Sequence, residues 1–110
     1  MATHLIPEQD DYFVLKPKHS AFFQTNLESL LSYLGATTLI LTGMAGDICV
    51  LFSANDAHMR NFKIVIPSDC VASQEAEAND QALRLMQRVL KAKTSPSSEL
   101  EFADTRILFR

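Results

Sequence analysis

The fold is decided by the stretch Thr37-Thr38-Leu39-Ile40-Leu41-Thr42-Gly43-Met44-Ala45-Gly46-Asp47-Ile48-Cys49-Val50. Its first five residues form a run without polar alternation, which is typical of a strand buried on both faces of a parallel sheet. A turn of small residues follows, and Asp47 can then cap a helix that we expect from about Ile48 to Arg60. Cys49 therefore lies in the first turn of the expected helix.

Strands and helices alternate on both sides of this stretch. Upstream, Thr25 and Glu28 have the spacing of a capping box. The leucines that follow repeat with helical spacing, and Gly35 stands where a C-cap glycine belongs, so we expect a helix between a Thr25 N-cap and Gly35. Downstream, residues 63–66 predict a second buried strand.

The outer parts of the chain add further elements. A helix is expected over about 75–91, and its predicted inner face holds Ala82, Leu85, Met86, Val89 and Leu90. We also expect a strand at 12–15, a loop at 94–99 and a short strand within 100–109. The alternation indicates one α/β domain, residues 1–110, with a parallel sheet.

In such a sheet, ligands bind at the carboxyl ends of the strands. The loops 16–22, 43–49 and 67–74 are expected there, and they hold most of the reactive side chains. At a helix start, unsatisfied N–H groups and a partial positive charge favour a thiolate, so Cys49 is a candidate nucleophile. Two alternatives stay open from the residues alone: a buried cysteine that fills space, and a redox pair of Cys49 with Cys70.

Composition narrows the class of protein. The 110 residues are 47% hydrophobic and 21% charged, and the net charge is −3. This profile is typical of a globular domain and gives no electrostatic reason to expect nucleic acid or an anionic membrane as a partner. No apolar run approaches the ~20 residues of a membrane span. The N-terminus lacks the pattern of a signal peptide, so we expect a cytoplasmic protein with reduced thiols.

Several motifs in order resemble the isochorismatase-like cysteine hydrolases, a superfamily that includes nicotinamidases. These motifs are Lys16 followed by Ser20-Ala21-Phe22, Gly43 followed by Asp47-Ile48-Cys49-Val50, Ser53-Ala54-Asn55-Asp56-Ala57, and a turn with Asp69. The resemblance covers residues 12 to about 91. It implies a Rossmann-like, three-layer αβα domain with a parallel sheet, of which this chain holds the C-terminal part.

The resemblance also implies roles for particular residues. The family uses an Asp–Lys–Cys triad, so Cys49 becomes the nucleophile and Lys16 its cationic partner. A non-proline cis bond is implied between Met44 and Ala45, with the N–H groups of Ala45 and Cys49 as oxyanion donors. His19, Phe22 and Gly43 are weaker candidates for contact with substrate.

The family's acidic residue lies on a first strand that has no counterpart before Lys16. Asp10 and Asp11 are expected at the opposite end of the 12–15 strand and are not convincing substitutes. The metal ligands of nicotinamidases also precede the lysine, and His4, His19 and His58 lack a ligand spacing, so we expect no metal and no cofactor.

Two functions follow from this pattern. The first is a hydrolase that acts through Cys49 on a small amide, imide or vinyl-ether-like molecule, with its activity impaired by the missing aspartate. The second is an inactive or oligomerising scaffold. A homo-oligomer is expected for either function, because the first strand should neighbour the cysteine strand and its loss leaves an open edge.

Overall fold

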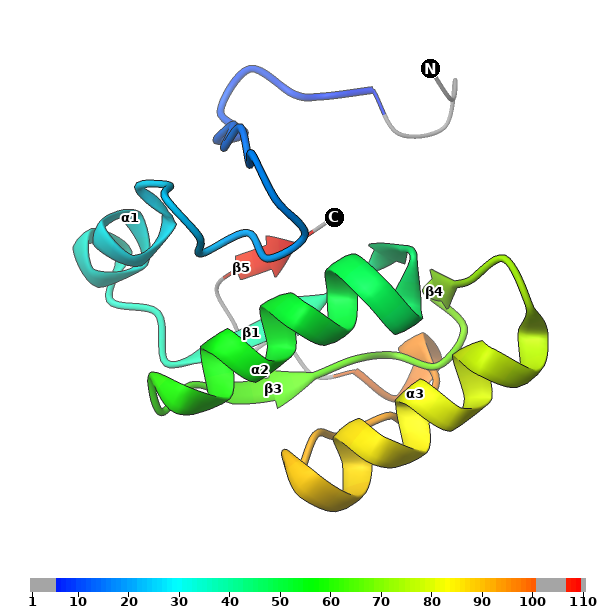
Figure 1. Ribbon diagram of the computed structural model, residues 1–110. Helices are drawn as coiled ribbons and strands as arrows, with labels where there is room; N and C mark the ends of the chain where they lie inside the picture. Colours follow the sequence, from blue (N-terminus) through cyan, green and yellow to red (C-terminus); the bar gives the residue numbers. More distant parts are fainter. Residues whose placement is uncertain (1–5, 101–106, 110) are drawn as a thin grey trace.

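The structure is a computed structural model, and it describes residues 6–100 and 107–109. Its main sheet is parallel and has three strands, β1 (Thr38–Leu41), β3 (Lys63–Val65) and β5 (Ile107–Phe109). The strand order is β3-β1-β5, so β1 lies in the middle (Figure 1). The predicted α/β fold with a parallel sheet is confirmed. The expected strand within 100–109 is present as β5, and residues 101–106 lie outside the described part.

Burial of β1 explains why its sequence lacks alternation. All four of its residues are buried, and Leu39, Ile40 and Leu41 are each 1% exposed. A strand with neighbours on both edges and apolar material on both faces favours apolar side chains, and three of the four residues here are apolar. The strand that leads to the cysteine turn is therefore in the middle of the sheet and fully buried.

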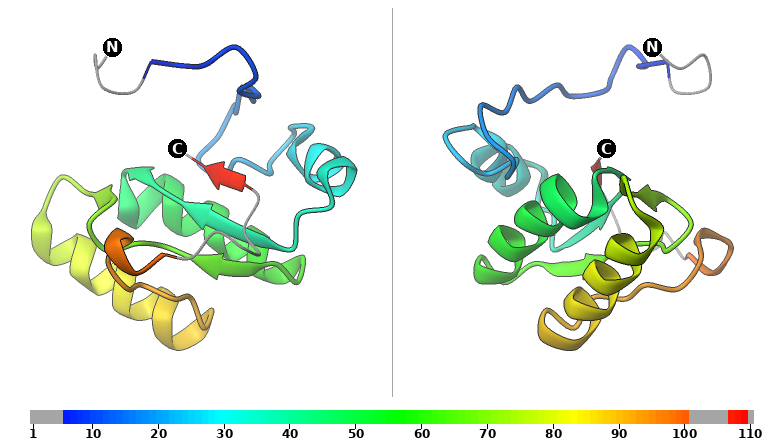
Figure 2. Two further views of the ribbon diagram at one scale, coloured as in Figure 1. Left: turned by 180° about the vertical axis from the view of Figure 1, so that it is seen from behind. Right: turned by 45° about the vertical axis from the view of Figure 1, so that its right-hand side comes forward.

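Helices α2 (Leu51–Met59) and α3 (Ala76–Val89) cover the same face of the sheet, as the opposite views of Figures 1 and 2 show. Helix α1 (Leu27–Leu34) lies apart from them and joins the hydrophobic core through Leu27 and Leu31. Within residues 6–100 and 107–109, no helix is long and apolar enough to cross a membrane.

Helix α1 ends as predicted but begins one residue later than a Thr25 cap would give. It ends at Gly35, which adopts a left-handed conformation with φ of 67°. The capping box is wrong: the N-cap residue is Asn26, and the Thr25 hydroxyl accepts a hydrogen bond from the Leu27 N–H at 3.2 Å. The carboxylate of Glu28 binds Arg60 at 2.7 Å, so a tertiary ion pair replaces the local contact.

Helix α3 buries a narrower face than predicted. Ala82, Met86 and Leu90 are buried at intervals of four residues, as the helical period requires. Leu85 and Val89 are 39% and 48% exposed, so their assignment to the inner face is wrong. They lie beside the stripe that faces the sheet rather than on it.

The predicted strand at 12–15 does not form. Residues 11–16 carry no strand or helix, and the N-terminal end of the described chain lies outside the body of the domain (Figure 1). Phe13 and Leu15 are 72% and 92% exposed. Their residue types favour a strand, but a strand also needs a neighbouring strand to pair with, and none of the described strands pairs with this segment.

The loop after β3 holds two other parts of the chain in place. Its short strand β4 (Val71–Ala72) pairs in parallel with β2 (Gly43–Met44), and the Gly43 N–H donates to the Cys70 carbonyl at 2.9 Å. The Asp69 carboxylate accepts hydrogen bonds from the Ser97 hydroxyl at 2.7 Å and the Ser97 N–H at 2.8 Å. Ser97 begins a 3₁₀ turn, Ser97–Glu99, within the expected loop at 94–99.

A glycine lets the turn that contains Cys49 approach α3. A Cβ atom added at Gly46 would overlap the Oδ1 of Asn79 and lie 3.3 Å from the Oγ of Ser73. Both atoms already form hydrogen bonds: the Ser73 hydroxyl donates to the Oδ1 of Asn79 at 2.7 Å and accepts from the Asp47 N–H at 3.2 Å. Any larger residue at position 46 must therefore displace this pair.

We predict that Gly46→Ala lowers the free energy of unfolding by about 1–3 kcal/mol, because the added methyl forces the Ser73–Asn79 pair apart. Chemical denaturation monitored by circular dichroism measures the change. Asn79→Ala removes the obstructing group, so the Gly46→Ala/Asn79→Ala double variant should lose less than the sum of the two single variants. Strict additivity would contradict the contact.

The hydrogen bonds from Ser97 lower the pKa of Asp69 below its usual range. The stabilising contribution is present above the ordinary pKa of an aspartate and disappears as the pH falls through the lower folded value. We predict that the Asp69 carboxyl signal in NMR titrates at higher pH in Ser97→Ala than in wild type. The exposed neighbour Ser98→Ala serves as a control and should leave the titration unchanged.

Candidate active site

Cys49 lies in a five-residue π-helical turn, Gly46–Val50, that precedes α2. The carbonyl of Ala45 accepts hydrogen bonds from the N–H groups of Ile48 and Val50. The predicted start of an α-helix at Ile48 under an Asp47 cap is therefore wrong. The N-cap residue of the turn is Ala45 rather than Asp47, and the Asp47 N–H donates to the hydroxyl of the distant Ser73, so a tertiary contact holds the turn.

Two predicted site residues meet the thiol. The Lys16 ammonium lies 3.3 Å from the Sγ of Cys49, and the Nδ1 of His19 lies 3.9 Å from the same atom. The ammonium also donates to the Lys18 carbonyl at 3.4 Å, which limits where the lysine side chain can point. The structure thus brings the loop 16–22 and the cysteine turn together, as expected from their places in the chain.

Helix α2 holds the lysine segment in position. The Ser20 hydroxyl donates a short hydrogen bond to the Asp56 carboxylate, and the Ala21 N–H donates to the Ser53 hydroxyl at 2.9 Å. Ser20 and Ser53 are both buried; the bond between Ala21 and Ser53 is buried, and the bond between Ser20 and Asp56 is partly so. Sequence reasoning assigned these groups no structural role. Ser53 and Asp56 are three residues apart, so they lie on one face of the helix, and this spacing was the signal that could have predicted a shared contact.

The remaining predicted site residues occupy different surroundings. The Met44–Ala45 peptide bond is cis, and Met44 is 71% exposed. Gly43 has a φ of 113° and lies in β2. Phe22 is buried in the core, where its ring packs against Phe62 and beneath the guanidinium of Arg60.

Both cysteines are free thiols, so the structure holds no Cys49–Cys70 disulfide. The Cys70 thiol lies 3.6 Å from the Asp69 carboxylate. Across residues 6–100, the hydrogen-bond partners of the Cys49 thiol are Lys16 and His19, and no carboxylate is among them. The same residues contain no group of three or more His, Cys, Asp or Glu that could hold a metal ion.

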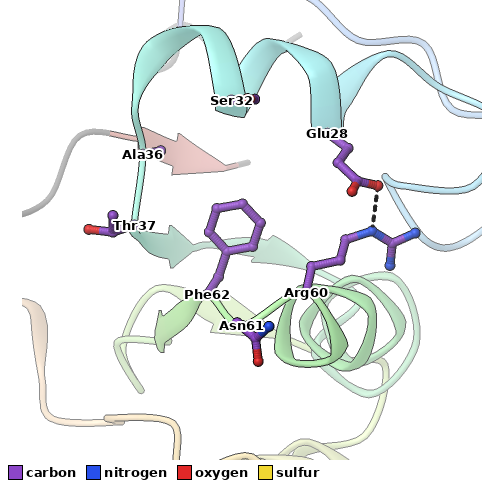
Figure 3. A pocket seen from close by; sticks show the side chains of 7 residues that line it. All are labelled: Glu28, Ser32, Ala36, Thr37, Arg60, Asn61 and Phe62. Atoms are coloured by element: carbon purple, nitrogen blue, oxygen red, sulfur yellow. Dashed lines mark hydrogen bonds and ion pairs between the residues drawn. The ribbon is translucent and has the colours of Figure 1, made fainter.

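A pocket of about 300 Å³ lies elsewhere, between α1 and the residues that precede β1 and β3 (Figure 3). The ion pair of Glu28 with Arg60 stands at its wall, and this hydrogen bond raises the pKa of the arginine. The pocket adjoins the amino ends of these strands, whereas Cys49 follows the carboxyl end of β1. It is therefore separate from the Lys16–Cys49 cluster.

Comparison with known proteins identifies the family of this chain. The isochorismatase domain family matches residues 2–96. An uncharacterised isochorismatase family protein of Bacillus subtilis, YaaI, is 49% identical over 89% of this chain and 54% of its own length. The ureidoacrylate amidohydrolase RutB of Methylobacterium radiotolerans is 33% identical over 71% of this chain and 30% of its own length.

Among solved structures, the nicotinamidase PncA of Bacillus subtilis is 38% identical and superposes with a TM-score of 0.73, over 74% of this chain and 45% of that enzyme. The chain spans about half the length of YaaI and of this nicotinamidase. The family match over most of the sequence, together with the parallel sheet and the cysteine turn, shows that the chain belongs to the isochorismatase family of hydrolases.

Proposed function

We propose that this chain acts as a cysteine hydrolase on a small amide, imide or vinyl-ether-like molecule, with Cys49 as nucleophile and Lys16 as its cationic partner. The observation that carries the proposal is the 3.3 Å contact between the Lys16 ammonium and the Cys49 sulfur. A nearby positive charge stabilises a thiolate, and the thiolate is the reactive form of cysteine.

In the proposed reaction, the Cys49 sulfur attacks the carbonyl carbon of an amide. A carbon–sulfur bond forms and the carbonyl oxygen takes up negative charge, which the N–H groups of Ala45 and Cys49 stabilise in this proposal. Collapse of the intermediate breaks the carbon–nitrogen bond and leaves a thioester, and the nitrogen departs as ammonia or an amine with the proton that the thiol gave up. Water then hydrolyses the thioester, releasing an acid and restoring the thiol.

The choice of substrate class rests on the relatives. The names nicotinamidase and ureidoacrylate amidohydrolase denote cleavage of small amides, and an isochorismatase of Bacillus subtilis is 37% identical over 74% of this chain. Cys49 is half-buried while Lys16 and His19 are exposed, so the cluster is open to solvent along the described residues. Access of a small molecule to the sulfur therefore requires no rearrangement of these residues.

A second candidate is an oligomerising scaffold without catalysis. It is favoured by the large apolar side chains that remain exposed close in sequence to the site, among them Leu15 at 92%, Met44 at 71% and Phe52 at 45%. Exposed apolar side chains are typical of surfaces that bind another chain where they form a contiguous patch. A second copy of the chain is the proposed partner in that case.

We predict that the wild-type protein hydrolyses at least one of nicotinamide, ureidoacrylate and N-carbamoyl compounds, and that Cys49→Ala abolishes this activity. Cys70→Ala should retain it, because Cys70 lies outside the cluster. Chromatography of the released acid measures turnover. Hydrolysis that persists in Cys49→Ala would rule out the mechanism, and a chain that is inactive in every assay but dimeric by light scattering would favour the scaffold.

We predict that Lys16→Met slows alkylation of Cys49 by iodoacetamide about fivefold at neutral pH, because the thiolate loses its neighbouring cation. The Cys70→Ala background ensures that only Cys49 reacts. The difference from the Lys16 parent should shrink in high salt, since salt screens exposed charges. Lys18→Met, which removes a lysine that contributes only its carbonyl, is the matched control and should react at the parental rate.

A further inference from the structure

We infer that Arg60 is a remote positioning residue of the Cys49 site, because it connects α1 and α2 to the chain segment that carries Lys16. The inference rests on the proposed function, since it concerns the contact between the Lys16 ammonium and the Cys49 sulfur. Arg60 is the C-cap residue of α2, and its side chain binds Glu28 and Asp56 rather than the thiol. Its effect on the sulfur therefore passes through other residues.

The guanidinium of Arg60 contacts three parts of the chain. Its Nε donates to the carboxylate of Glu28 in α1 at 2.7 Å (Figure 3). Its Nη1 donates to the carbonyl and the carboxylate of Asp56 in α2, at 3.0 Å and 3.3 Å. Its Cζ lies 4.9 Å from the centroid of the Phe22 ring, in the segment before α1. A guanidinium carries its donors in a rigid planar fork and can stack on a ring, so one side chain makes all of these contacts.

The contact with Asp56 leads to the lysine segment. The Oδ1 of Asp56 accepts a hydrogen bond from Arg60, and its Oδ2 accepts one from the buried hydroxyl of Ser20. Because the arginine holds one oxygen, it limits the rotation of the carboxylate and keeps the other oxygen directed at Ser20. Residues 16–20 contain no helix or strand, so contacts of this kind determine where Lys16 lies.

The contact with Phe22 holds the same segment by a second route. The Phe22 side chain is buried, and its ring packs against Phe62 with centroids 6.3 Å apart. A cation over an aromatic face is attracted more strongly where water is excluded. The Phe22 N–H donates to the Ser20 hydroxyl at 3.1 Å, so the two routes from Arg60 meet at Ser20.

Solvent exposure distinguishes these contacts from the ion pair with α1. The Glu28 side chain is 62% exposed, whereas that of Asp56 is 26% exposed. Exposed ion pairs contribute little, because water screens them and both side chains lose freedom. The positioning effect of Arg60 is therefore assigned to its contacts with Asp56 and Phe22.

The position of the lysine segment affects the reactivity of the thiol. The attraction between an ammonium and a thiolate falls as their separation grows, and water weakens it further. The Lys16 Nζ lies 3.3 Å from the sulfur of Cys49, so a segment that moves more freely spends less time at this distance. Loss of Arg60 should therefore make the thiol less reactive without a change in the cysteine turn itself.

The test uses the full chain in the Cys70→Ala background and follows alkylation of Cys49 by iodoacetamide at neutral pH. We expect Arg60→Met to slow the reaction about threefold, which is less than the effect of removing the lysine itself. Glu28→Gln removes the exposed partner of the same arginine and is the matched control, which should react at the parental rate. Equal slowing in Glu28→Gln would assign the effect to the ion pair with α1 and would overturn the inference.

A double variant separates positioning from other effects of the substitution. In the Lys16→Met background, Arg60→Met should cause no further slowing, because the arginine acts through the lysine. A long-range effect of the lost charge or a general loosening of the domain would persist there and would overturn the inference, as would an unchanged rate in folded Arg60→Met. If Arg60→Met does not fold, Ser20→Ala breaks the same link and should show the same dependence on Lys16.

Turnover gives an independent readout. On the amide that the wild type cleaves, Arg60→Met should lower kcat about threefold and leave KM within about twofold, because Arg60 is remote from the sulfur that the substrate must reach. A rise in KM with unchanged kcat would contradict the positioning role. If the wild type cleaves no amide but alkylation still shows the dependence of Arg60 on Lys16, the positioning role stands and the hydrolase proposal fails.

Discussion

The docking of residues 20–22 onto α2 is the contact on which the site depends. The described chain ahead of α1 has no helix or strand of its own, so its backbone is positioned only by what it touches. The buried hydroxyl of Ser20 binds Asp56, and Ser53 binds the next backbone N–H. These two bonds hold the segment close enough for Lys16 and His19 to reach the thiol.

A second support of the cysteine turn comes from α3 and the residues just before it. The cysteine turn approaches α3 because position 46 is a glycine, and its backbone is bound there through Ser73. The turn is thus held by β1, which precedes it, and by α3. The two residues that contact its thiol, Lys16 and His19, come from the segment that is bound to α2. Strand β1 and helices α2 and α3 therefore position the groups of the cluster.

Elements that depend on contacts between residues close in sequence form as predicted, whereas elements that depend on distant residues do not. Strand β1, helix α1 and the Gly35 cap depend on burial patterns and backbone preferences that neighbouring residues express, and they form as predicted. The strand at 12–15, the Thr25–Glu28 capping box and the Asp47 cap fail. Glu28 binds the distant Arg60, and the Asp47 N–H binds the distant Ser73. Residues 12–15 pair with none of the strands that the structure describes.

The sequence by itself determined the parallel α/β fold, the family and the candidate residues Cys49, Lys16 and His19, because hydrophobic periodicity and motif spacing are written along the chain. Only the tertiary structure decided that the lysine and the histidine both contact the sulfur, that the cysteine turn is π-helical, and that Phe22 packs in the core. Those outcomes depend on contacts between residues about 30 positions apart, whose distances no local pattern encodes.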